Sequence, residues 1–342
     1  MEVTVIGSGS WGTGFARLLA LNGHVVEVLT LTAEEAAQLN ATRVNEHFLP
    51  GVVVPDGVTF RAMSDADLES AELIVYAVPT QALRQVAAWV GQRRDSPVLQ
   101  LSLAKGLELQ TFRRPTEIIT AETGMPAAAL SGPNHAEEVA RDMPSATVIA
   151  AADTELCTTL QRVVTSEVFR VYTNDDVIGV EFCGAVKNPI AIAVGMSDGL
   201  GFGDNTRASL ITRSLAEVIR LGTRLGARFE TFAGLAGIGD MIATCTSRHS
   251  RNRRAGELLA LGHAPAELEG LIGQVVEGIP TTYAVHDLCA ELGVEMPVSE
   301  NVYEALELGK DPRDCVRSLM SREPKMEGLR IDSSGLRGLA RR

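Results

Sequence analysis

A glycine-rich turn between a strand pattern and a helix pattern constrains this chain more than any other feature. Residues 3–6 form an apolar run, and a Gly-x-Gly-x-x-Gly motif and a helical pattern follow it. In this motif Gly7 permits a tight turn, Gly9 lets the backbone approach a pyrophosphate, and Gly12 lets the helix pack closely on the strand. The N–H groups at the start of the helix attract phosphates. The turn therefore predicts a dinucleotide site, although an ordinary strand-turn-helix unit without a ligand can carry the same glycines.

The first half of the chain repeats this alternation of strands and helices. Asn22 and Gly23 end the first helix, and residues 25–29 begin a second strand. Short apolar runs of this kind are typical of strands that are buried on both faces of a parallel sheet. Further strands are expected at residues 58–62, 73–78, 98–103, 129–130, 146–151 and 168–172. We predict a Rossmann-like, doubly wound α/β sheet with ligands at the carboxyl ends of its strands, where residues 78–80 and 104–106 fall.

The pattern changes from about residue 177 onward. Residues 179–199, 205–225 and 281–292 carry helix-forming residues with recurrent apolar spacing, so the second half is predicted to be mostly helical. We therefore predict a dinucleotide-binding Rossmann-like domain over residues 1–178 and a helical substrate and catalytic domain over residues 179–342. The Arg-rich end, residues 337–342, is interpreted as a solvated tail.

The composition argues against several classes of function. A formal net charge of −12 argues against nonspecific nucleic-acid binding. The five cysteines form no Cys-x-x-Cys pair and the six histidines no His-Glu-x-x-His motif, so we expect reduced thiols and no metal. No apolar run approaches the ~18 residues that cross a bilayer, and no basic leader precedes the first strand. A cytoplasmic protein without a membrane span is expected; the sequence does not fix its oligomeric state, and a homodimer is compatible with it.

Three polar groups stand out in the helical half. Lys187 lies in an otherwise apolar segment, residues 183–195, so its ammonium group must reach solvent or a partner. A functional lysine and a structural ion pair explain it equally well. Asp240 ends a glycine-rich turn and is either a site carboxylate or a helix N-cap. Residues 247–254 hold several arginines and hydroxyl groups, which suit a phosphate monoester or a solvated basic helix start.

Ordered motifs along nearly the whole chain resemble the bacterial-type NAD(P)-dependent glycerol-3-phosphate dehydrogenases. These motifs occupy residues 7–14, 45–50, 102–107, 131–139, 186–191, 199–205, 231–240 and 250–253. Several motifs in one order are more specific than a single glycine motif. The resemblance implies a Rossmann-like N-terminal domain, an all-helical C-terminal domain, and an active site between them.

The resemblance also implies roles for individual residues, with Lys187 as the catalytic acid and base. The residues that it places around glycerol 3-phosphate are Lys105, Gly132, Asn134, Lys187, Asp240, Ser250, Arg251 and Asn252. Besides the three glycines of the turn, the residues that it places around the cofactor are Ser10, Trp11, Lys105, Ala136, Arg251, Val275 and Glu277. Asn134 departs from the family, which commonly has a hydroxyl residue there, but an amide can still donate to a substrate oxygen.

The activity that the resemblance implies is the interconversion of dihydroxyacetone phosphate and sn-glycerol 3-phosphate with NAD(P)H, which feeds phospholipid synthesis. Reduction of a ketone places negative charge on its oxygen, and a lysine held by Asp240 can stabilise and protonate that oxygen. Two other interpretations remain open. A related dehydrogenase for another hydroxy acid would not need residues 250–252, and a non-catalytic nucleotide sensor would not need Lys187 and Asp240.

The segment after the second strand departs from the resemblance. Family members commonly carry an aromatic residue and then a basic residue that favours NADPH, whereas Leu31 or Thr32 takes the basic position here. An acidic residue about 20 positions past the glycines would favour NADH, but Glu34 and Glu35 fall at the start of the next helix. We therefore predict weak discrimination between NADPH and NADH, with Arg43 folding back to supply a charge as the alternative.

Overall fold

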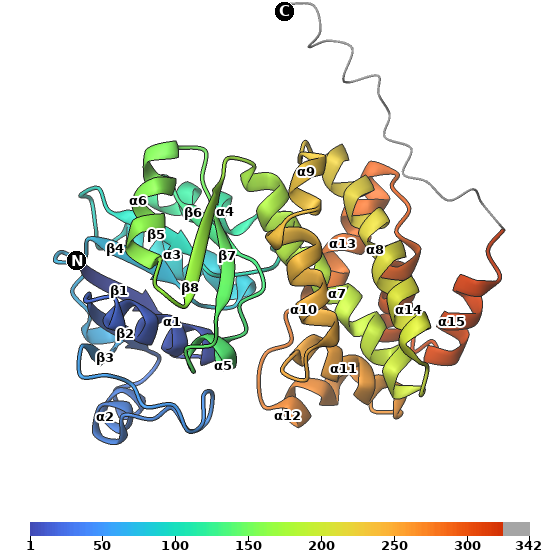
Figure 1. The fold of residues 1–342 in the computed structure, drawn as a ribbon, viewed down its shortest axis with the longest axis horizontal. Helices are drawn as coiled ribbons and strands as arrows, with labels where there is room; N and C mark the ends of the chain where they lie inside the picture. Colours follow the sequence, from blue (N-terminus) through green and yellow to red (C-terminus); the bar gives the residue numbers. More distant parts are fainter. Residues whose placement is uncertain (324–342) are drawn as a thin grey trace, which may run out of the picture.

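Eight strands form a single sheet in the order β3-β2-β1-β4-β5-β6-β7-β8 (Figure 1). The computed structural model describes residues 1–323, and the predicted tail at residues 337–342 lies outside them. The strands are β1 (Glu2–Ile6), β2 (Val25–Thr30), β3 (Val58–Ala62), β4 (Leu73–Tyr76), β5 (Leu99–Ser102), β6 (Ala128–Ser131), β7 (Ser145–Ala150) and β8 (Phe169–Asn174). Every predicted strand is present to within two residues. The Rossmann-like, doubly wound sheet is confirmed, and within it β6 and β7 run antiparallel while the other neighbouring strands run parallel.

The connection from β6 to β7 reverses the direction of the chain. That connection contains only the four-residue helix α5 (Ala136–Val139), whereas parallel neighbours are usually joined by a longer helical crossover. The chain leaves β6 at Gly132, whose φ of +140° favours glycine. This turn places Gly132 and Asn134 at the carboxyl end of β6.

Helices cover both faces of the sheet, as strands that are apolar on two sides require. On one face Phe15 of α1 and Leu160 of α6 share an apolar cluster with Val5 of β1. On the other face Leu83 of α3 and Ile118 of α4 share a second cluster with strand residues. The elements of this part are α1 (Ser10–Leu21), α2 (Ala33–Thr42), the short helix η1 (Met63–Asp65), α3 (Thr80–Gly91), α4 (Pro115–Thr123) and α6 (Thr154–Val164).

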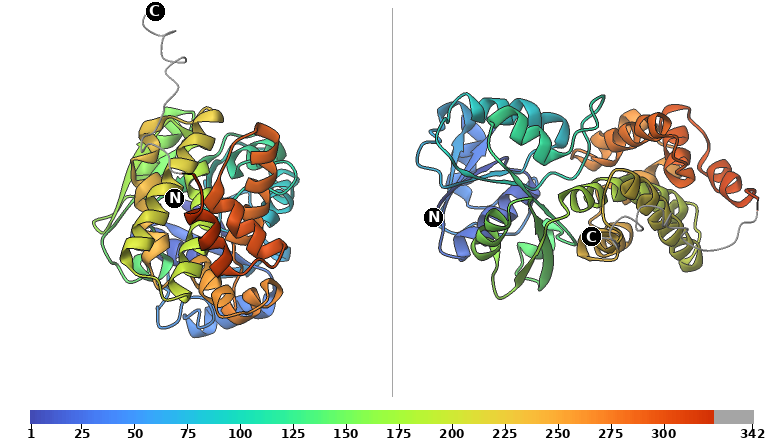
Figure 2. Two further views of the ribbon diagram at one scale, coloured as in Figure 1. Left: turned by 90° about the vertical axis from the view of Figure 1, so that its right-hand side faces the viewer. Right: turned by 90° about the horizontal axis from the view of Figure 1, so that it is seen from above.

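The remaining described residues are helical and pack around α7 (Val177–Gly199), beside the sheet (Figure 2). By length and composition α7 could cross a membrane, but 89% of its apolar window is buried inside the protein, as in the core helix of a large protein. The other helices are α8 (Asp204–Arg224), α9 (Phe229–Phe232), η2 (Leu235–Gly239), α10 (Asp240–Thr246), α11 (Arg251–Ala260), η3 (Pro265–Glu267), α12 (Leu268–Ile272), α13 (Gly278–Leu292), α14 (Pro297–Glu307) and α15 (Pro312–Met320). The predicted mostly helical second half is confirmed for residues up to 323.

Glycines at the crossing of α7 and α11 let these two helices approach very closely. A Cβ atom at Gly195 would lie 1.9 Å from a carbonyl oxygen of α11, and one at Gly256 would lie 2.0 Å from a carbonyl oxygen of α7. No side chain larger than hydrogen fits at such distances without a shift of the backbone. The close crossing brings residues 250–252, at the start of α11, beside Asn188 of α7.

Candidate active site

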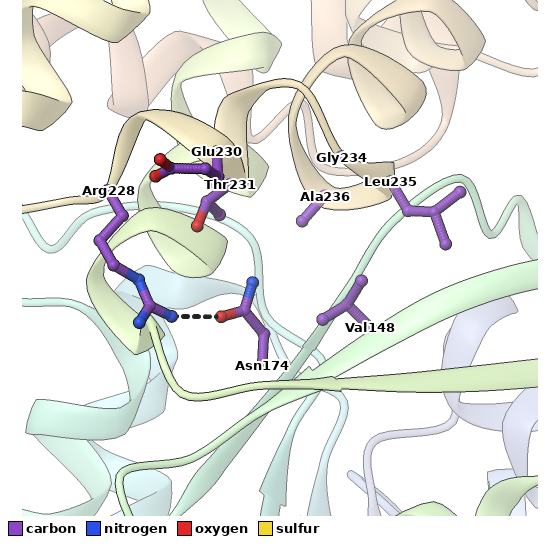
Figure 3. Close-up of a pocket in the computed structure, with 8 residues that line it drawn as sticks. All are labelled: Val148, Asn174, Arg228, Glu230, Thr231, Gly234, Leu235 and Ala236. Atoms are coloured by element: carbon purple, nitrogen blue, oxygen red, sulfur yellow. Dashed lines mark hydrogen bonds between the residues drawn. The ribbon is translucent and has the colours of Figure 1, made fainter.

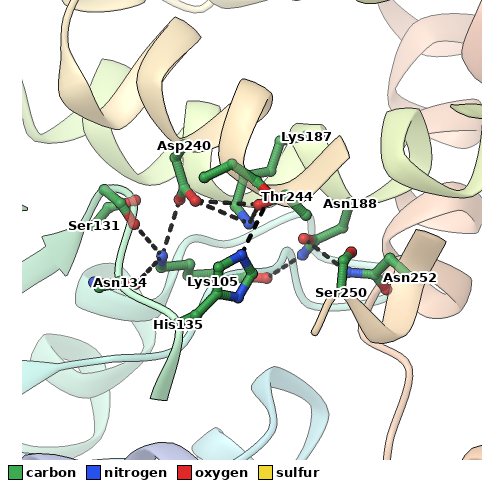
Figure 4. Close-up of polar contacts among 12 residues, drawn as sticks. Lys105, Ser131, Asn134, His135, Lys187, Asn188, Asp240, Thr244, Ser250 and Asn252 are labelled. Atoms are coloured by element: carbon green, nitrogen blue, oxygen red, sulfur yellow. Dashed lines mark hydrogen bonds and ion pairs between the residues drawn. The ribbon is translucent and has the colours of Figure 1, made fainter. Parts of the chain in front are cut away.

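Lys187 points from α7 into a group of polar side chains between the sheet and the helical part (Figure 4). Because the surrounding segment is buried, its ammonium group requires partners. The Nζ atom donates a hydrogen bond to Thr244 Oγ1 at 2.6 Å and lies 3.3 Å from Asp240 Oδ1. Among residues 1–323 these are its polar partners, so one of the three N–H groups is left for a bound molecule.

Asp240 begins α10, and its carboxylate joins two lysines. Oδ1 faces Lys187, and Oδ2 lies 2.9 Å from the Nζ atom of Lys105. Thr244 lies one turn later on the same face of α10 and donates its hydroxyl to Oδ1 at 3.2 Å. Burial alone would raise the pKa of Asp240, but the two ammonium groups outweigh burial and hold the pKa below its ordinary value. Asp240 is therefore an anion between two lysines, and the N-cap of α10 is Gly239.

Lys105 follows β5 and reaches the same carboxylate from the sheet. Its Nζ atom donates to Asp240 Oδ2 at 2.9 Å, to Asn134 Oδ1 at 2.6 Å, and to the carbonyl oxygen of Gly132 at 2.9 Å. All three N–H groups of this ammonium are thus engaged. Burial lowers the pKa of Lys105 to about 8, with Asp240 opposing this shift and Lys187 adding to it.

Ser250, Arg251 and Asn252 lie at the start of α11, close to these lysines. Ser250 is the N-cap of the helix, and its hydroxyl accepts a hydrogen bond from a first-turn N–H at 3.2 Å. Asn252 donates to Asn188 Oδ1 at 3.0 Å, and Asn188 in turn donates to the carbonyl oxygen of Lys105 at 2.9 Å. The start of a helix, a hydroxyl and a guanidinium together form a suitable environment for an anion.

Arg251 and Glu277 extend this group toward the sheet. Arg251 is exposed and donates from Nη1 to the carbonyl oxygen of Val275 at 3.2 Å. Glu277 accepts the backbone N–H of Thr80, at the start of α3, on Oε1 at 2.9 Å. Its Oε2 atom is buried without a hydrogen-bond partner in the described part of the chain, and burial raises the pKa of this carboxyl. A buried polar atom without a partner is a position at which a ligand can donate a hydrogen bond.

The glycine-rich turn between β1 and α1 has the predicted geometry. Gly7 has a φ of +111°, and a Cβ atom there would lie 2.5 Å from a backbone oxygen. A Cβ atom at Gly12 would lie 2.0 Å from the carbonyl oxygen of Gly7, but nothing lies within 4 Å of the corresponding position at Gly9. No side chain caps α1, so the first-turn N–H groups at Ser10 and beyond have no side-chain acceptor. The turn offers both open space and backbone donors to a pyrophosphate.

Trp11 and Ala136 border the same turn. The Trp11 ring packs against Phe15, with ring centroids 5.5 Å apart, and its buried Nε1 atom has no partner within residues 1–323. Ala136 begins α5, which contacts α1. With open space at Gly9 at one end and the unpartnered Oε2 atom of Glu277 at the other, the residues present fit a dinucleotide.

The structure divides the predicted residues into two groups, and no hydrogen bond or ion pair within residues 1–323 joins one group to the other. The group around the lysines contains Lys105, Gly132, Asn134, Lys187, Asp240, Ser250, Arg251 and Asn252, with Val275 and Glu277 beside it. The group around the glycine turn contains Gly7, Gly9, Ser10, Trp11, Gly12 and Ala136.

Sequence reasoning missed three residues of the lysine group. Thr244 lies four positions after Asp240, so the helical period alone could have indicated it. Asn188 follows Lys187 directly, and its side chain links the carbonyl oxygen of Lys105 to Asn252 of α11. His135 lies in the same group, with Nε2 3.3 Å from the carbonyl oxygen of Ala243, and burial lowers its pKa (Figure 4). No spacing rule pointed to these last two residues.

A cavity of about 380 Å³ lies away from the lysines, where β7 and β8 meet α9 and η2 (Figure 3). Its lining includes Asn174 and Arg228, and Arg228 donates to Asn174 Oδ1 at 3.0 Å. Arg228 also pairs with the exposed Asp175. None of the predicted site residues lines this cavity, so it is separate from the lysine group.

Comparisons with known proteins point to one family. The model of the NAD-dependent glycerol-3-phosphate dehydrogenase N-terminus matches residues 2–157, and that of the C-terminus matches residues 176–317. The chain is 46% identical over 330 residues to a glycerol-3-phosphate dehydrogenase [NAD(P)+] of Geobacillus thermodenitrificans, covering 95% of this chain and 96% of the relative. It is 47% identical over 321 residues to that of Moorella thermoacetica, covering 94% and 96%. A crystal structure of glycerol-3-phosphate dehydrogenase from Coxiella burnetii superposes with a TM-score of 0.90 at 38% identity, covering 94% of this chain and 99% of that one.

Proposed function

The chain belongs to the NAD-dependent glycerol-3-phosphate dehydrogenase family, and we propose that Lys187 is the acid and base of its reaction. The enzyme interconverts dihydroxyacetone phosphate and sn-glycerol 3-phosphate. Bound NAD(P)H supplies the hydride for reduction of the ketone. The ketone oxygen then gains negative charge, which an ammonium group can stabilise and protonate. In the reverse direction the same nitrogen takes the proton of the hydroxyl group.

One difference between the two lysines supports this role for Lys187. Lys105 has three acceptors for its three N–H groups, while Lys187 has two partners, Thr244 and Asp240. The remaining N–H of Lys187 can therefore reach a substrate oxygen without breaking a contact. Asp240 lies 3.3 Å from the Nζ atom of Lys187 and orients the ammonium group, which is the observation that carries the proposal.

The residues around Lys187 suggest how the substrate is held. We propose that Ser250, Arg251 and Asn252 bind the phosphate, because a helix start and a guanidinium both suit a phosphate monoester. Gly132 and Asn134 would contact the triose itself, as would Lys105 if a substrate oxygen replaced one of its three present acceptors. The dinucleotide would extend from the glycine turn, Ser10, Trp11 and Ala136 to Lys105, Arg251, Val275 and Glu277.

Three broader statements are also proposals. The boundary between the two domains would lie near residue 178, where α7 begins.

A cytoplasmic location, with glycerol phosphate passing to phospholipid synthesis, is supported by five free, buried cysteines, since reduced thiols are usual in that compartment. Fractionation of cells tests the location. A homodimer is the third proposal, and light scattering of the pure chain tests it.

The role of Lys187 is tested by the steady-state rate of NADH or NADPH oxidation with dihydroxyacetone phosphate. Lys187→Ala should lower kcat by on the order of 10²–10⁴, because loss of an acid affects the transition state. The dissociation constant of the cofactor should change little. Lys310→Ala is the matched control and should leave kcat unchanged. It removes a lysine between α14 and α15 that pairs with Glu304. Near-normal turnover of Lys187→Ala would rule out the proposed role.

A further inference from the structure

A carboxylate contacts the glycine-rich turn, although its residue does not lie at the expected position about 20 residues past the glycines. Glu35 lies in the first turn of α2, after the end of β2, where the sequence offered no acidic residue at the usual position. In the structure its side chain reaches back, and the hydroxyl of Ser8 donates to Glu35 Oε1 at 2.5 Å. Ser8 lies between Gly7 and Gly9, so this carboxylate lies beside the turn itself. No hydrogen bond to Glu35 Oε2 occurs within residues 1–323.

Both partners of this contact are held in place by the surrounding chain. The carbonyl oxygen of Ser8 accepts hydrogen bonds from Asn45 Nδ2 at 2.7 Å and from Thr13 Oγ1 at 3.1 Å. The backbone N–H of Glu35 donates to Thr32 Oγ1, the N-cap of α2, at 3.2 Å. Thr32 is one of the two positions at which family members commonly carry a basic residue that favours NADPH. Here its hydroxyl caps the helix that carries Glu35.

The first two arginines after β2 in the sequence do not offset the carboxylate. Arg43, the alternative source of charge, donates to the carbonyl oxygens of Val54 at 3.3 Å and Val58 at 2.8 Å, and also to that of Pro55. Arg61 pairs with Glu27 at 2.5 Å. The guanidinium groups of both arginines are thus already engaged, and the two charged residues in the first turn of α2, Glu34 and Glu35, are both acidic.

We propose that Glu35 makes this enzyme prefer NADH over NADPH, an inference that rests on the cofactor binding at the glycine turn. In a Rossmann-like fold the adenosine ribose lies between that turn and the end of β2, and an acidic side chain there accepts the ribose 2′-hydroxyl. The open Oε2 atom of Glu35 can take this role. A 2′-phosphate would instead bring its own negative charge against the carboxylate, and like charges in contact are unfavourable. This proposal differs from the prediction of weak discrimination, which assumed that no acidic group lies near the turn.

Calorimetric dissociation constants for NADH and NADPH test the proposal without any turnover. The full-length chain should bind NADH at least roughly tenfold more tightly than NADPH, a ratio that corresponds to about 1.4 kcal/mol. Glu35→Gln keeps the shape of the side chain and should reduce this ratio to about threefold or less, mainly by tightening NADPH. Glu34→Gln removes the same charge from the exposed neighbouring residue and should leave the ratio as in the parent.

Each outcome of this titration has a distinct meaning. Equal affinity of the unchanged chain for the two cofactors, or the same preference in Glu35→Gln as in the parent, overturns the role of Glu35 and leaves the dehydrogenase function intact. Loss of selectivity in Glu34→Gln as well would show that overall charge, not the contact with Ser8, sets the preference, and so overturns the proposal too. Absence of binding for either dinucleotide would instead contradict cofactor binding at this turn. Adenosine monophosphate and its 2′-phosphorylated form should repeat the same order in a thermal-shift assay.

Discussion

At the scale of single residues, the site is built on one carboxylate that contacts two lysines from distant parts of the chain. Asp240 lies 2.9 Å from Lys105 and 3.3 Å from Lys187. Removing such a carboxylate would leave two buried ammonium groups facing each other, which is costly. The carboxylate fixes both lysines, but only Lys187 has an N–H group without a partner in the described chain. The two lysines can therefore have different roles.

The pH dependence of the reaction should reflect Lys105. Burial lowers its pKa to about 8, so the ammonium loses its proton as the pH rises through that value. The substrate phosphate, with a second pKa of ~6, is already a dianion there and does not titrate further. We expect kcat/KM for dihydroxyacetone phosphate to fall above pH of about 8, as the positive charge of Lys105 is lost.

The matched variant for this profile is Lys105→Arg, whose guanidinium stays charged to a pKa of ~12 or above. Relative to its own maximum, this variant should lose the decline above pH of about 8. A parent profile that stays flat well above this pH would contradict the assignment. So would an identical decline in the arginine variant.

Arg251 should act on the phosphate of the substrate. Its guanidinium donates one hydrogen bond, to Val275, and is otherwise exposed beside the start of α11. Arg251→Ala should raise KM for dihydroxyacetone phosphate by roughly tenfold or more, because a charge-assisted contact is worth about 1.5–3 kcal/mol. At a saturating concentration of the cofactor, unphosphorylated dihydroxyacetone, which lacks the contact, should be used equally by parent and variant.

Arg254 provides the control for this measurement, because it lies on the same helix and pairs with Glu257 at 3.0 Å. Arg254→Ala should leave KM unchanged. If Arg251→Ala handles the phosphorylated substrate as well as the parent does, the phosphate is bound elsewhere.

At the scale of elements, the site depends on how closely α11 crosses α7. Lys187 and Asn188 belong to α7, and the predicted phosphate group belongs to the start of α11. Gly195 and Gly256 set the separation of the two helices, since a Cβ atom at either would lie within 2.0 Å of the opposite backbone. The position of the phosphate group relative to Lys187 is therefore fixed by backbone packing rather than by a flexible loop.

Substitution at this crossing should destabilise the fold. Gly195→Ala should lower the free energy of unfolding by about 1–3 kcal/mol or more, because overpacking against a backbone forces the helices apart. Gly270→Ala in α12 is the control, since nothing lies within 4 Å of its Cβ position and alanine favours helix. Thermal unfolding measured for both variants tests this, and an unchanged Tm for Gly195→Ala would contradict the close crossing.

At the scale of the whole molecule, the sequence was sufficient for the main features of the fold. Apolar runs located every strand, since strands buried on both faces leave a continuous pattern. The same patterns could not show that β7 would run antiparallel to β6, because direction depends on the length and shape of the connection around Gly132. They also could not show which helices cross closely, because contacts between glycines distant in sequence leave no periodic signal.

The site was predictable in its members but not in its geometry. Motifs named Lys105, Lys187 and Asp240, yet the shared carboxylate appears only when α7, α10 and the end of β5 meet in space. Glu35 was missed for the same reason, because its contact with the turn depends on the fold and not on sequence spacing. Counting residues from the glycines placed it outside the turn, while its side chain reaches back to Ser8. Spacing rules describe backbone positions, and the reach of a side chain has to be seen in the fold.

The most direct test of the central claim is a single-turnover measurement of hydride transfer, because steady-state rates can be limited by product release. Enzyme preloaded with NADH is mixed with dihydroxyacetone phosphate, and the loss of NADH absorbance is followed in the parent and in Lys187→Ala. With Lys187 as the proton donor, the variant should transfer hydride on the order of 10²–10⁴ times more slowly, with unchanged NADH affinity. A single-turnover rate within about threefold of the parent would contradict the account, because an effect that small is less than 1 kcal/mol of transition-state stabilisation.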